Sequence, residues 1–252
     1  MHFLLTNDDG IQSEGLWALA AALKPHGEVT VVAPLSEASA TSQSITLARP
    51  LRILPYRNPL GIEAHAVDGT PADCVKLGLL RIVPRATCVV AGINRGANVG
   101  GGVFYSGTVA AAREGRLAGR EAAAVSLHVI PGETPDFRPA ASHAALVLAR
   151  LLRGGGERVV WNLNYPARLV RTEVCVVPQD GNGLRERYDD APGAGFVLEG
   201  TWEERPPEAR TDLAMIRSGR ISLTPLTVDW TDRVALDAAS EILFAPGRRE
   251  DA

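Results

Sequence analysis

The sequence predicts an α/β fold with a doubly wound, largely parallel sheet, followed by a β-rich extension. Over residues 1–163, short apolar runs typical of buried strands alternate with segments of helical periodicity. That alternation is typical of βαβ units, whose strands run parallel. Past residue 163 the alternation stops, and short strand-like pieces are separated by stretches rich in Gly, Pro and Asp.

The first strand is the apolar run that precedes Asp8. Further buried strands are expected at residues 29–33, 88–91, 122–127 and 159–163, and shorter ones at 45–47, 51–56 and 62–67. Helices are expected at residues 14–24, 70–80, 106–119 and 137–152. Ser13 is a plausible N-cap. Thr70 followed by Pro71 and Asp73 is typical of a capped helix start, which gives Asp73 a structural role rather than a catalytic one.

The C-terminal part has no strand–helix alternation. Strand-like pieces are expected at residues 174–177, 196–198 and 221–228, and a last helix at 234–244 is capped by Thr231 and Asp232. We interpret these pieces as a β-rich extension rather than a second alternating domain. Extensions of this type often make contacts between subunits.

The composition excludes several classes of protein. The chain has 252 residues, 46% of them hydrophobic, and a net charge of −3, which is ordinary for a soluble globular protein. The chain lacks the surplus of basic residues that would indicate binding to duplex nucleic acid. No apolar stretch approaches the length of a membrane helix. We expect a cytoplasmic protein whose three cysteines, Cys74, Cys88 and Cys175, are buried free thiols.

Two adjacent carboxylates follow the first strand. Successive strand side chains point to opposite faces, so Asp8 and Asp9 converge only if the chain has already turned, and Asn7 and Gly10 are typical turn residues. Open α/β sheets bind their ligands at this carboxyl edge. A lone Asp-Asp-Gly is equally typical of a solvated turn or a helix cap, so the rest of the sequence must decide whether these carboxylates form a site.

Two further polar loops follow buried strands and meet the same edge of the sheet. One contains Ser39 and the other contains Asn94. Together with Asp8 and Asp9 they offer oxygen atoms only, without thiol or imidazole. Such a set suits Mg²⁺, Mn²⁺ or Ca²⁺ better than zinc or copper. Ser36, Thr41, Ser42 and Ser44 are alternatives to Ser39 in its loop.

A phosphate site is expected behind the glycine-rich loop at residues 92–102. Ser106, Gly107 and Thr108 begin a helix, where free backbone N–H groups and the helix dipole favour an anion. The loop matches neither a Walker loop nor a dinucleotide fingerprint. A cation beside a phosphate indicates phosphate-ester hydrolysis, in which an Asp could accept a proton from the attacking water.

At this point the sequence resembles the SurE family of stationary-phase survival proteins, which are metal-dependent nucleotidases. The matching blocks occur in family order over residues 1–130. They are TNDDG at residues 6–10, AP at 33–34 with Ser39 and SITL at 44–47, GTPADCV at 69–75, GINRGAN at 92–98, and YSGTVAAAREG at 105–115. Five ordered blocks are far more specific than any one of them.

The resemblance implies a three-layer α/β/α Rossmann-like core with one divalent cation, Mg²⁺ or Mn²⁺, per subunit. Its four metal-ligand positions fall on Asp8, Asp9, Ser39 and Asn94, and catalysis would rest on Asp8, Asp9 and Asn94. Phosphate contacts would come from Asn98, Ser106, Gly107 and Thr108. Residues 1–165 would then form the metal- and phosphate-binding core, and residues 166–252 an oligomerisation extension.

The implied activity is hydrolysis of nucleoside 5′-monophosphates, with 3′ esters left open. The resemblance also implies a homodimer or homotetramer that exchanges C-terminal elements between subunits. The sequence departs from the family pattern at Ala40, where a glycine is common, at Ala91, where a serine is usual, and at Gly101 and Gly102, where an acidic pair is frequent. These departures put the level of activity in question more than the class of reaction.

Two alternatives remain open on the sequence. One is a nucleotide-binding or sensing protein with weak or lost turnover, for which Gly101 and Gly102 are the motivation. The other is an aspartyl-phosphate phosphatase of the haloacid dehalogenase type. That family separates its two acids by one residue, whereas Asp8 and Asp9 are adjacent.

Overall fold

The computed structural model describes residues 1–153, 159–181, 184–191, 193, 195–202 and 207–244. Its centre is a nine-stranded sheet of order β3-β4-β2-β1-β5-β6-β7-β11-β8. The strands are β1 (His2–Thr6), β2 (Glu28–Pro34), β3 (Ile53–Pro55), β4 (Glu63–Val67), β5 (Cys88–Arg95), β6 (Glu121–Leu127), β7 (Val159–Tyr165), β8 (Val174–Val176) and β11 (Ile221–Thr227). Within this sheet the pairs β3–β4 and β7–β11 are antiparallel, and the other pairs are parallel.

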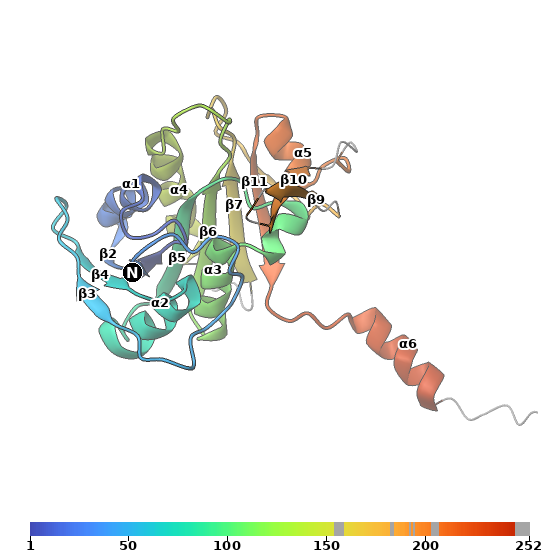
Figure 1. The fold of residues 1–252 in the computed structure, drawn as a ribbon, viewed down its shortest axis with the longest axis horizontal. Helices are drawn as coiled ribbons and strands as arrows, with labels where there is room; N and C mark the ends of the chain where they lie inside the picture. The colour runs from blue at the N-terminus through green and yellow to red at the C-terminus, as the bar shows by residue number, and fades with distance from the viewer. Residues whose placement is uncertain (154–158, 182–183, 192, 194, 203–206, 245–252) are drawn as a thin grey trace, which may run out of the picture.

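Helices cover both faces of the sheet (Figure 1). Helices α1 (Glu14–Leu23) and α4 (Arg138–Leu151) lie in one apolar core, and α2 (Pro71–Leu77) and α3 (Gly107–Leu117) lie in the other. The two cores explain why β1 is buried along its whole length, since one residue faces each core in turn. The predicted three-layer α/β/α fold is confirmed.

Several elements differ from those expected. Residues 45–47 form no strand, because the segment is an exposed loop tied to α2 through Thr46 and Asp73. Strand β5 continues to Arg95 rather than ending at residue 91, with a bulge between Ala91 and Asn94. Helix α5 (Asp212–Arg217) and strand β9 (Leu184–Ala191) have no counterpart in the sequence prediction.

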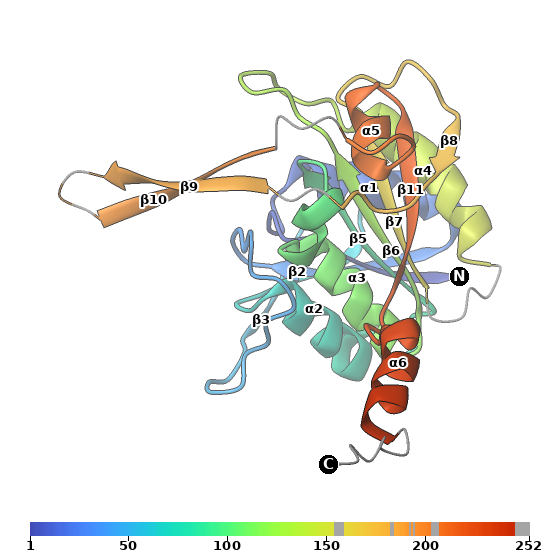
Figure 2. The same ribbon diagram turned by 90° about the vertical axis from the view of Figure 1, so that its right-hand side faces the viewer.

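The C-terminal part of the chain divides into two kinds of structure. Strands β8 and β11 extend the main sheet and α5 packs beside them, whereas β9 and β10 (Gly195–Trp202) form a separate antiparallel hairpin. That hairpin and helix α6 (Arg233–Phe244) both project away from the sheet (Figures 1 and 2). The division of the chain at residue 165 stays a prediction.

The cysteines and the membrane prediction can be compared with the structure directly. Cys74 and Cys88 are buried free thiols, and Cys175 is a free thiol that is partly exposed. In the described part of the chain, no helix combines the length and the apolar character needed to cross a membrane.

Candidate active site

The turn after β1 places both carboxylates at one point. Asn7 is fully buried, and its Nδ2 donates to the carbonyl oxygen of Gly10 at 2.9 Å. Gly10 has φ +94°, a left-handed conformation that side chains rarely adopt. Pro34 O, at the end of β2, accepts a hydrogen bond of 2.8 Å from the N–H of Ile11. The predicted turn is therefore present and is fixed against the neighbouring strand.

Asp8 is held by the start of helix α3. Its Oδ2 accepts a hydrogen bond of 3.0 Å from the backbone N–H of Thr108, and its Oδ1 accepts from the Thr108 hydroxyl. Gly107 permits this approach, because a Cβ there would lie 2.9 Å from the Cβ and Oδ2 atoms of Asp8. Burial raises the pKa of Asp8, although the hydrogen bonds from Thr108 oppose that effect.

Asp9 lies beside Asp8 but is less buried. Its Oδ2 accepts a hydrogen bond of 3.1 Å from the backbone N–H of Arg95, at the end of β5. Burial, together with the negative charge of Asp8, raises the pKa of Asp9 to about 6. Two carboxylates that are both hard to ionise side by side are electrostatically suited to a bound cation.

Asn94 and Ser39 lie in the same pocket as the two carboxylates. The Nδ2 of Asn94 donates to the carbonyl oxygen of Gly96 at 2.8 Å, which leaves the amide oxygen as the atom available to a ligand. The Ser39 hydroxyl donates to Glu37 Oε1 at 2.7 Å, so the lone pairs of its oxygen stay available as well. The structure thus brings together all four positions expected to bind a metal.

The pocket around these residues has a volume of about 1020 Å³. Its lining includes several side chains that the sequence did not identify as site residues, among them Glu37, Arg95 and Tyr188. The negative charge of Glu37 also raises the pKa values of Asp8 and Asp9. Glu37 and Tyr188 lie in a loop and a hairpin strand without a recognisable motif, whereas Arg95 lies within the block at residues 92–98, where the sequence predicts only Asn94 and Asn98 as site residues.

The predicted phosphate contacts occupy different positions. Asn98 and Ser106 line the pocket, whereas Gly107 and Thr108 do not. The Ser106 Oγ accepts a hydrogen bond of 3.0 Å from Val109 N and so caps helix α3. Thr108 has no exposed surface and directs both of its donors to Asp8. Its observed contact is therefore with a carboxylate of the site, and its phosphate role stays a prediction.

Asn98 is fixed by a network of polar side chains from the next two strands. Its N–H donates to Asn164 Oδ1 at 2.8 Å, and its Nδ2 donates to Ser126 Oγ at 2.9 Å. Its carbonyl oxygen accepts from the Nδ2 atoms of Asn162 and Asn164. These bonds use its N–H, its carbonyl oxygen and one of the two hydrogens on Nδ2, so Asn98 fixes the path of the loop, and its phosphate contact stays a prediction.

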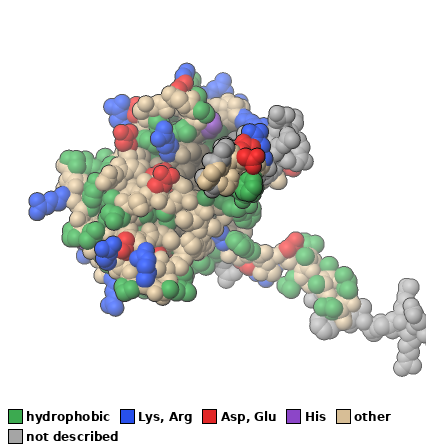
Figure 3. Space-filling view, viewed as in Figure 1, with side chains coloured by type: hydrophobic (Ala, Val, Ile, Leu, Met, Phe, Trp, Pro, Cys, Tyr) green, Lys and Arg blue, Asp and Glu red, His purple; other side chains and the backbone are tan. Residues whose placement is uncertain are grey.

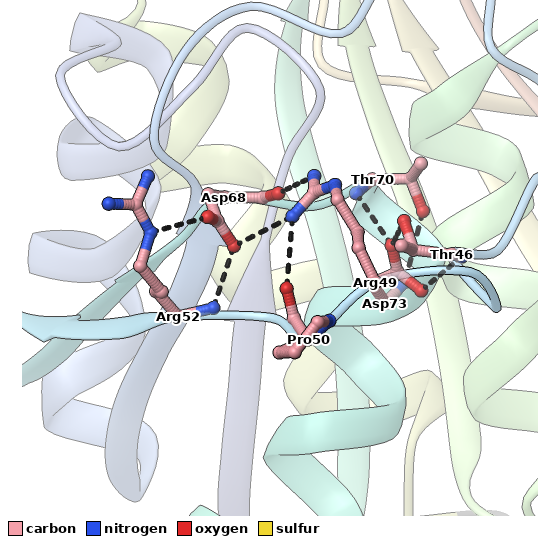
Figure 4. A network of polar contacts seen from close by, with 7 residues as sticks. All are labelled: Thr46, Arg49, Pro50, Arg52, Asp68, Thr70 and Asp73. Carbon is pink, nitrogen blue, oxygen red and sulfur yellow. Dashed lines mark hydrogen bonds and ion pairs between the residues drawn. The ribbon is translucent and has the colours of Figure 1, made fainter.

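The loop that contains Ser39 is tied to helix α2 by Asp73 (Figure 4). Asp73 accepts hydrogen bonds from Thr46 N at 2.9 Å, from Thr46 Oγ1 at 2.7 Å and from Thr70 N at 3.0 Å. Thr70 Oγ1 accepts from Asp73 N in return, which completes a capping box. The structural role predicted for Asp73 is confirmed.

The donor set fits a hard divalent cation. Among the described residues, no group of three or more His, Cys, Asp or Glu side chains is arranged to bind a metal, so ligation here depends on hydroxyl and amide oxygens beside two carboxylates. Magnesium and related ions accept such oxygen sets and retain several waters. The raised pKa of Asp9 is the second observation in favour of this fit, since a bound cation would stabilise the ionised carboxylate against both its burial and the charge of Asp8.

Comparison with known proteins shows the family of the chain. The family model described as "Survival protein SurE" matches residues 3–182. The chain belongs to the SurE family. It is 41% identical over 245 residues to a protein named 5′-nucleotidase SurE from Nitratidesulfovibrio vulgaris (strain DP4), covering 94% of this chain and 97% of that protein.

Two further relatives of the SurE family cover almost the whole chain. A protein named 5′-nucleotidase SurE from Clostridium botulinum (strain Kyoto / Type A2) is 37% identical over 253 residues, covering 97% of this chain and 100% of its own. The crystal structure of the SurE protein from Aquifex aeolicus has a TM-score of 0.81 at 32% identity, covering 96% of this chain and 100% of that chain. The resemblance inferred from the sequence blocks is thus confirmed.

The departures from the SurE pattern have visible positions in the structure. Ala40, next to Ser39, has φ 55°, which explains why a glycine is common there. Ala91 is fully buried in β5 and pairs with Thr6, whose hydroxyl oxygen is buried without a hydrogen-bond partner among the described residues. Gly101 and Gly102 lie in a short 3₁₀ helix, Gly100–Phe104, between Asn98 and Ser106.

Proposed function

We propose that this chain is a divalent-metal-dependent 5′-nucleotidase, which hydrolyses nucleoside 5′-monophosphates to nucleoside and phosphate. The observation that supports it most directly is the meeting of Asp8, Asp9, Ser39 and Asn94 in one pocket with Ser106, the N-cap of α3. Relatives of 37% and 41% identity are named 5′-nucleotidases. A pocket of about 1020 Å³ has the size of a small-molecule site.

Asp8, Asp9, Ser39 and Asn94 would hold one Mg²⁺ or Mn²⁺ ion. When bound, such an ion supplies Lewis acidity toward a phosphoryl oxygen and lowers the pKa of a coordinated water. Asp8 is suited to a fixed ligand position, because Thr108 donates two hydrogen bonds to its carboxylate and restricts its rotation. A side chain that is already buried and restrained loses little further conformational entropy when the cation binds.

Asp9 is the group placed to accept the proton from the attacking water. Its Oδ2 is engaged by Arg95 N, while its Oδ1 makes no hydrogen bond within the described part of the chain. The side chain lines the pocket, so that oxygen is accessible to a water beside the phosphate.

The phosphate and the nucleoside would meet different walls of the pocket. Ser106, Asn98 and the guanidinium of Arg95 offer donors and positive charge to the phosphate. Tyr105 and Tyr188 are 55% and 69% exposed and line the same pocket, so they offer aromatic faces for a base.

The test is phosphate release from a panel of nucleoside 5′- and 3′-monophosphates with Mg²⁺, Mn²⁺ or a chelator. We expect turnover of 5′ esters that the chelator abolishes, and a loss of at least about 100-fold in kcat/KM for Asp8→Asn and Asp9→Asn. Circular dichroism and thermal melts would check that both variants stay folded. Full turnover in metal-free buffer would refute the proposal.

The same assay separates the two alternatives. Nucleotide binding without phosphate release would favour a sensing protein. A trapped phospho-aspartate would favour the haloacid dehalogenase type of chemistry. Against the latter, Asp8 is 4% exposed and both its oxygens accept hydrogen bonds from Thr108, which is unfavourable for a nucleophile.

We also propose that the chain forms a homodimer or homotetramer through its projecting C-terminal elements, consistent with the expected oligomerisation role of residues 166–252. Helix α6 exposes Val234, Ile242 and Leu243, and Figure 3 shows hydrophobic side chains along this projecting segment. Phe196 and Tyr188 are likewise exposed on the hairpin. Light scattering should detect a dimer or tetramer, and Ile242→Glu combined with Val234→Glu should shift it toward monomer. The cytoplasmic location expected from the sequence stays a prediction.

A further inference from the structure

Three consecutive glycines lie between the Asn94 ligand position and the start of helix α3. Gly100, Gly101 and Gly102 belong to the loop that also contains Asn98 and leads to Ser106. Glycine loses more conformational freedom on folding than any other residue, so such a run is costly to order. The loop nevertheless lines the pocket at its Gly102 end. Something outside the loop must therefore hold it.

The C-terminal segment binds both backbone groups of Gly100. The N–H of Gly100 donates to Asp212 Oδ2 at 3.0 Å, and its carbonyl oxygen accepts from Gln179 Nε2 at 2.7 Å. The residue before it, Val99, packs in a small apolar cluster with Leu213 and Ile216 of helix α5. One turn of the glycine loop is thus held by hydrogen bonds and by apolar packing at once.

Asp212 is the centre of this arrangement. It is fully buried, and its second oxygen, Oδ1, accepts hydrogen bonds from Asp180 N at 2.8 Å and Leu213 N at 2.7 Å. One carboxylate thereby joins three backbone N–H groups, one of them 112 residues away in sequence. Asp212 does not line the pocket, and among its described hydrogen bonds the one to Gly100 connects it to the loop that does.

We infer that Asp212 is a positioning residue for substrate binding, which fixes the glycine loop through Gly100 so that Asn98, Gly102 and Ser106 face the nucleotide. This inference rests on the proposed nucleotidase function and assigns a role in it to a residue outside the family match at residues 3–182. Gln179 supports the same turn from the carbonyl side.

The two oxygens of Asp212 allow a selective substitution. In Asp212→Asn, the remaining oxygen can keep the bonds from Asp180 N and Leu213 N, while the new amide NH₂ would face the N–H of Gly100 and break that contact. The matched control is Thr211→Ala, which removes the N-cap of α5 but touches no atom of Gly100. Gln179→Ala is a second test, and it leaves α5 intact.

The experiment compares these variants in the Mn²⁺-loaded protein. For Asp212→Asn we expect KM for adenosine 5′-monophosphate and Ki for inorganic phosphate to rise about 10-fold. We expect kcat and Mn²⁺ affinity to change less than twofold. Amide hydrogen exchange at residues 100–102 should be faster than in wild type when no substrate is bound. Gln179→Ala should change the same quantities in the same direction. Thr211→Ala should lower the melting temperature without changing KM.

A wild-type KM and wild-type exchange in Asp212→Asn would overturn the inference, as would an equal rise in KM in Thr211→Ala. Absence of turnover in the wild-type protein would instead refute the proposed function. In that case the exchange rates and phosphate binding would still decide whether Asp212 positions the loop.

Discussion

Thr108 donates two hydrogen bonds to Asp8, one from its backbone N–H and one from its hydroxyl, across 100 residues of sequence. This contact joins the N-terminus of helix α3 to the turn after β1. It means that the helix start expected to bind a phosphate is also the element that orients a carboxylate of the site.

The first prediction concerns that hydroxyl. Thr108→Val keeps the shape of the side chain but removes one donor from a buried carboxylate, so we expect a loss of about 1–3 kcal/mol in the free energy of unfolding and at least a 10-fold loss in kcat/KM. Thr108→Ser restores the hydroxyl and should stay within about threefold of wild type. Denaturant unfolding and steady-state kinetics measure both quantities. Equal activity in the Val and Ser variants would contradict the prediction.

The second prediction concerns Gly107. A Cβ at this position would lie 2.9 Å from Asp8, so Gly107→Ala should displace the carboxylate and weaken Mn²⁺ binding at least 10-fold. Gly119→Ala, beyond the other end of the same helix, is the control. It meets no atom within 4 Å but has φ +78°, so it should lower stability by about 1 kcal/mol without affecting metal binding. Titration calorimetry would separate the two.

The third prediction concerns Asp9 and pH. Its pKa of about 6 in the folded protein lies above the value of about 3.9 expected in the unfolded chain, so the folded state binds the proton more tightly. The stabilisation from this group is therefore complete below pH about 4 and is lost as pH rises through 6. Asn does not ionise, so the Asp9→Asn variant does not lose this stabilisation at high pH. In metal-free buffer at pH 7.5 it should melt at a higher temperature than wild type.

Adding Mn²⁺ is the control for this effect. The ion should raise the melting temperature of wild type at pH 7.5 and leave Asp9→Asn nearly unchanged. If the two proteins melt together without metal at pH 7.5, the raised pKa of Asp9 is not a property of the folded protein.

The fourth prediction uses the backbone at Ala40. This residue has φ 55° and is exposed, so the cost of its conformation depends on the side chain and not on packing. Ala40→Gly should fold with a stability within about 0.5 kcal/mol of wild type, because relief of strain offsets the greater freedom of the unfolded chain. Ala40→Val should lose at least about 1 kcal/mol and weaken Mn²⁺ binding through Ser39. Thermal melts with and without Mn²⁺ test both, and a Val variant as stable as the Gly variant would contradict it.

The features of the site that could be predicted are those with local causes. Asn7 and Gly10 are turn residues by their own chemistry, and the turn they predict is present. Alternation of apolar runs and helical periods fixes the parallel sheet, and parallel strands bring their carboxyl ends to one edge. That rule predicts that Asp8, the loop of Ser39 and Asn94 meet at this edge, and they line one pocket, whereas the choice of Ser39 within its loop depended on the resemblance. Their binding of a metal stays a prediction.

The features that could not be predicted depend on contacts distant in sequence. Nothing near Thr108 indicates that its donors point to Asp8, and its place at a helix start favours an anion equally well. Strand β9 contains Asp189 and Asp190, which are poor strand formers, and among the described residues it pairs with its neighbour β10 alone. Helix α5 has six residues, too few for a period to show.

The hydrogen bond between Gly100 and Asp212 also sets an order for synthesis on the ribosome. Synthesis runs from the N-terminus, so Asp8 and Asp9 leave the exit tunnel long before Asp212, the residue that holds the glycine loop. A nascent chain that ends before α5 already contains the expected ligands for a cation. It lacks the Asp212 carboxylate and the α5 side chains that pack on Val99, which hold the glycine loop on the nucleotide side of the pocket. If Asp212 positions the loop as inferred above, competence for substrate arises only after α5 has been made and has left the tunnel.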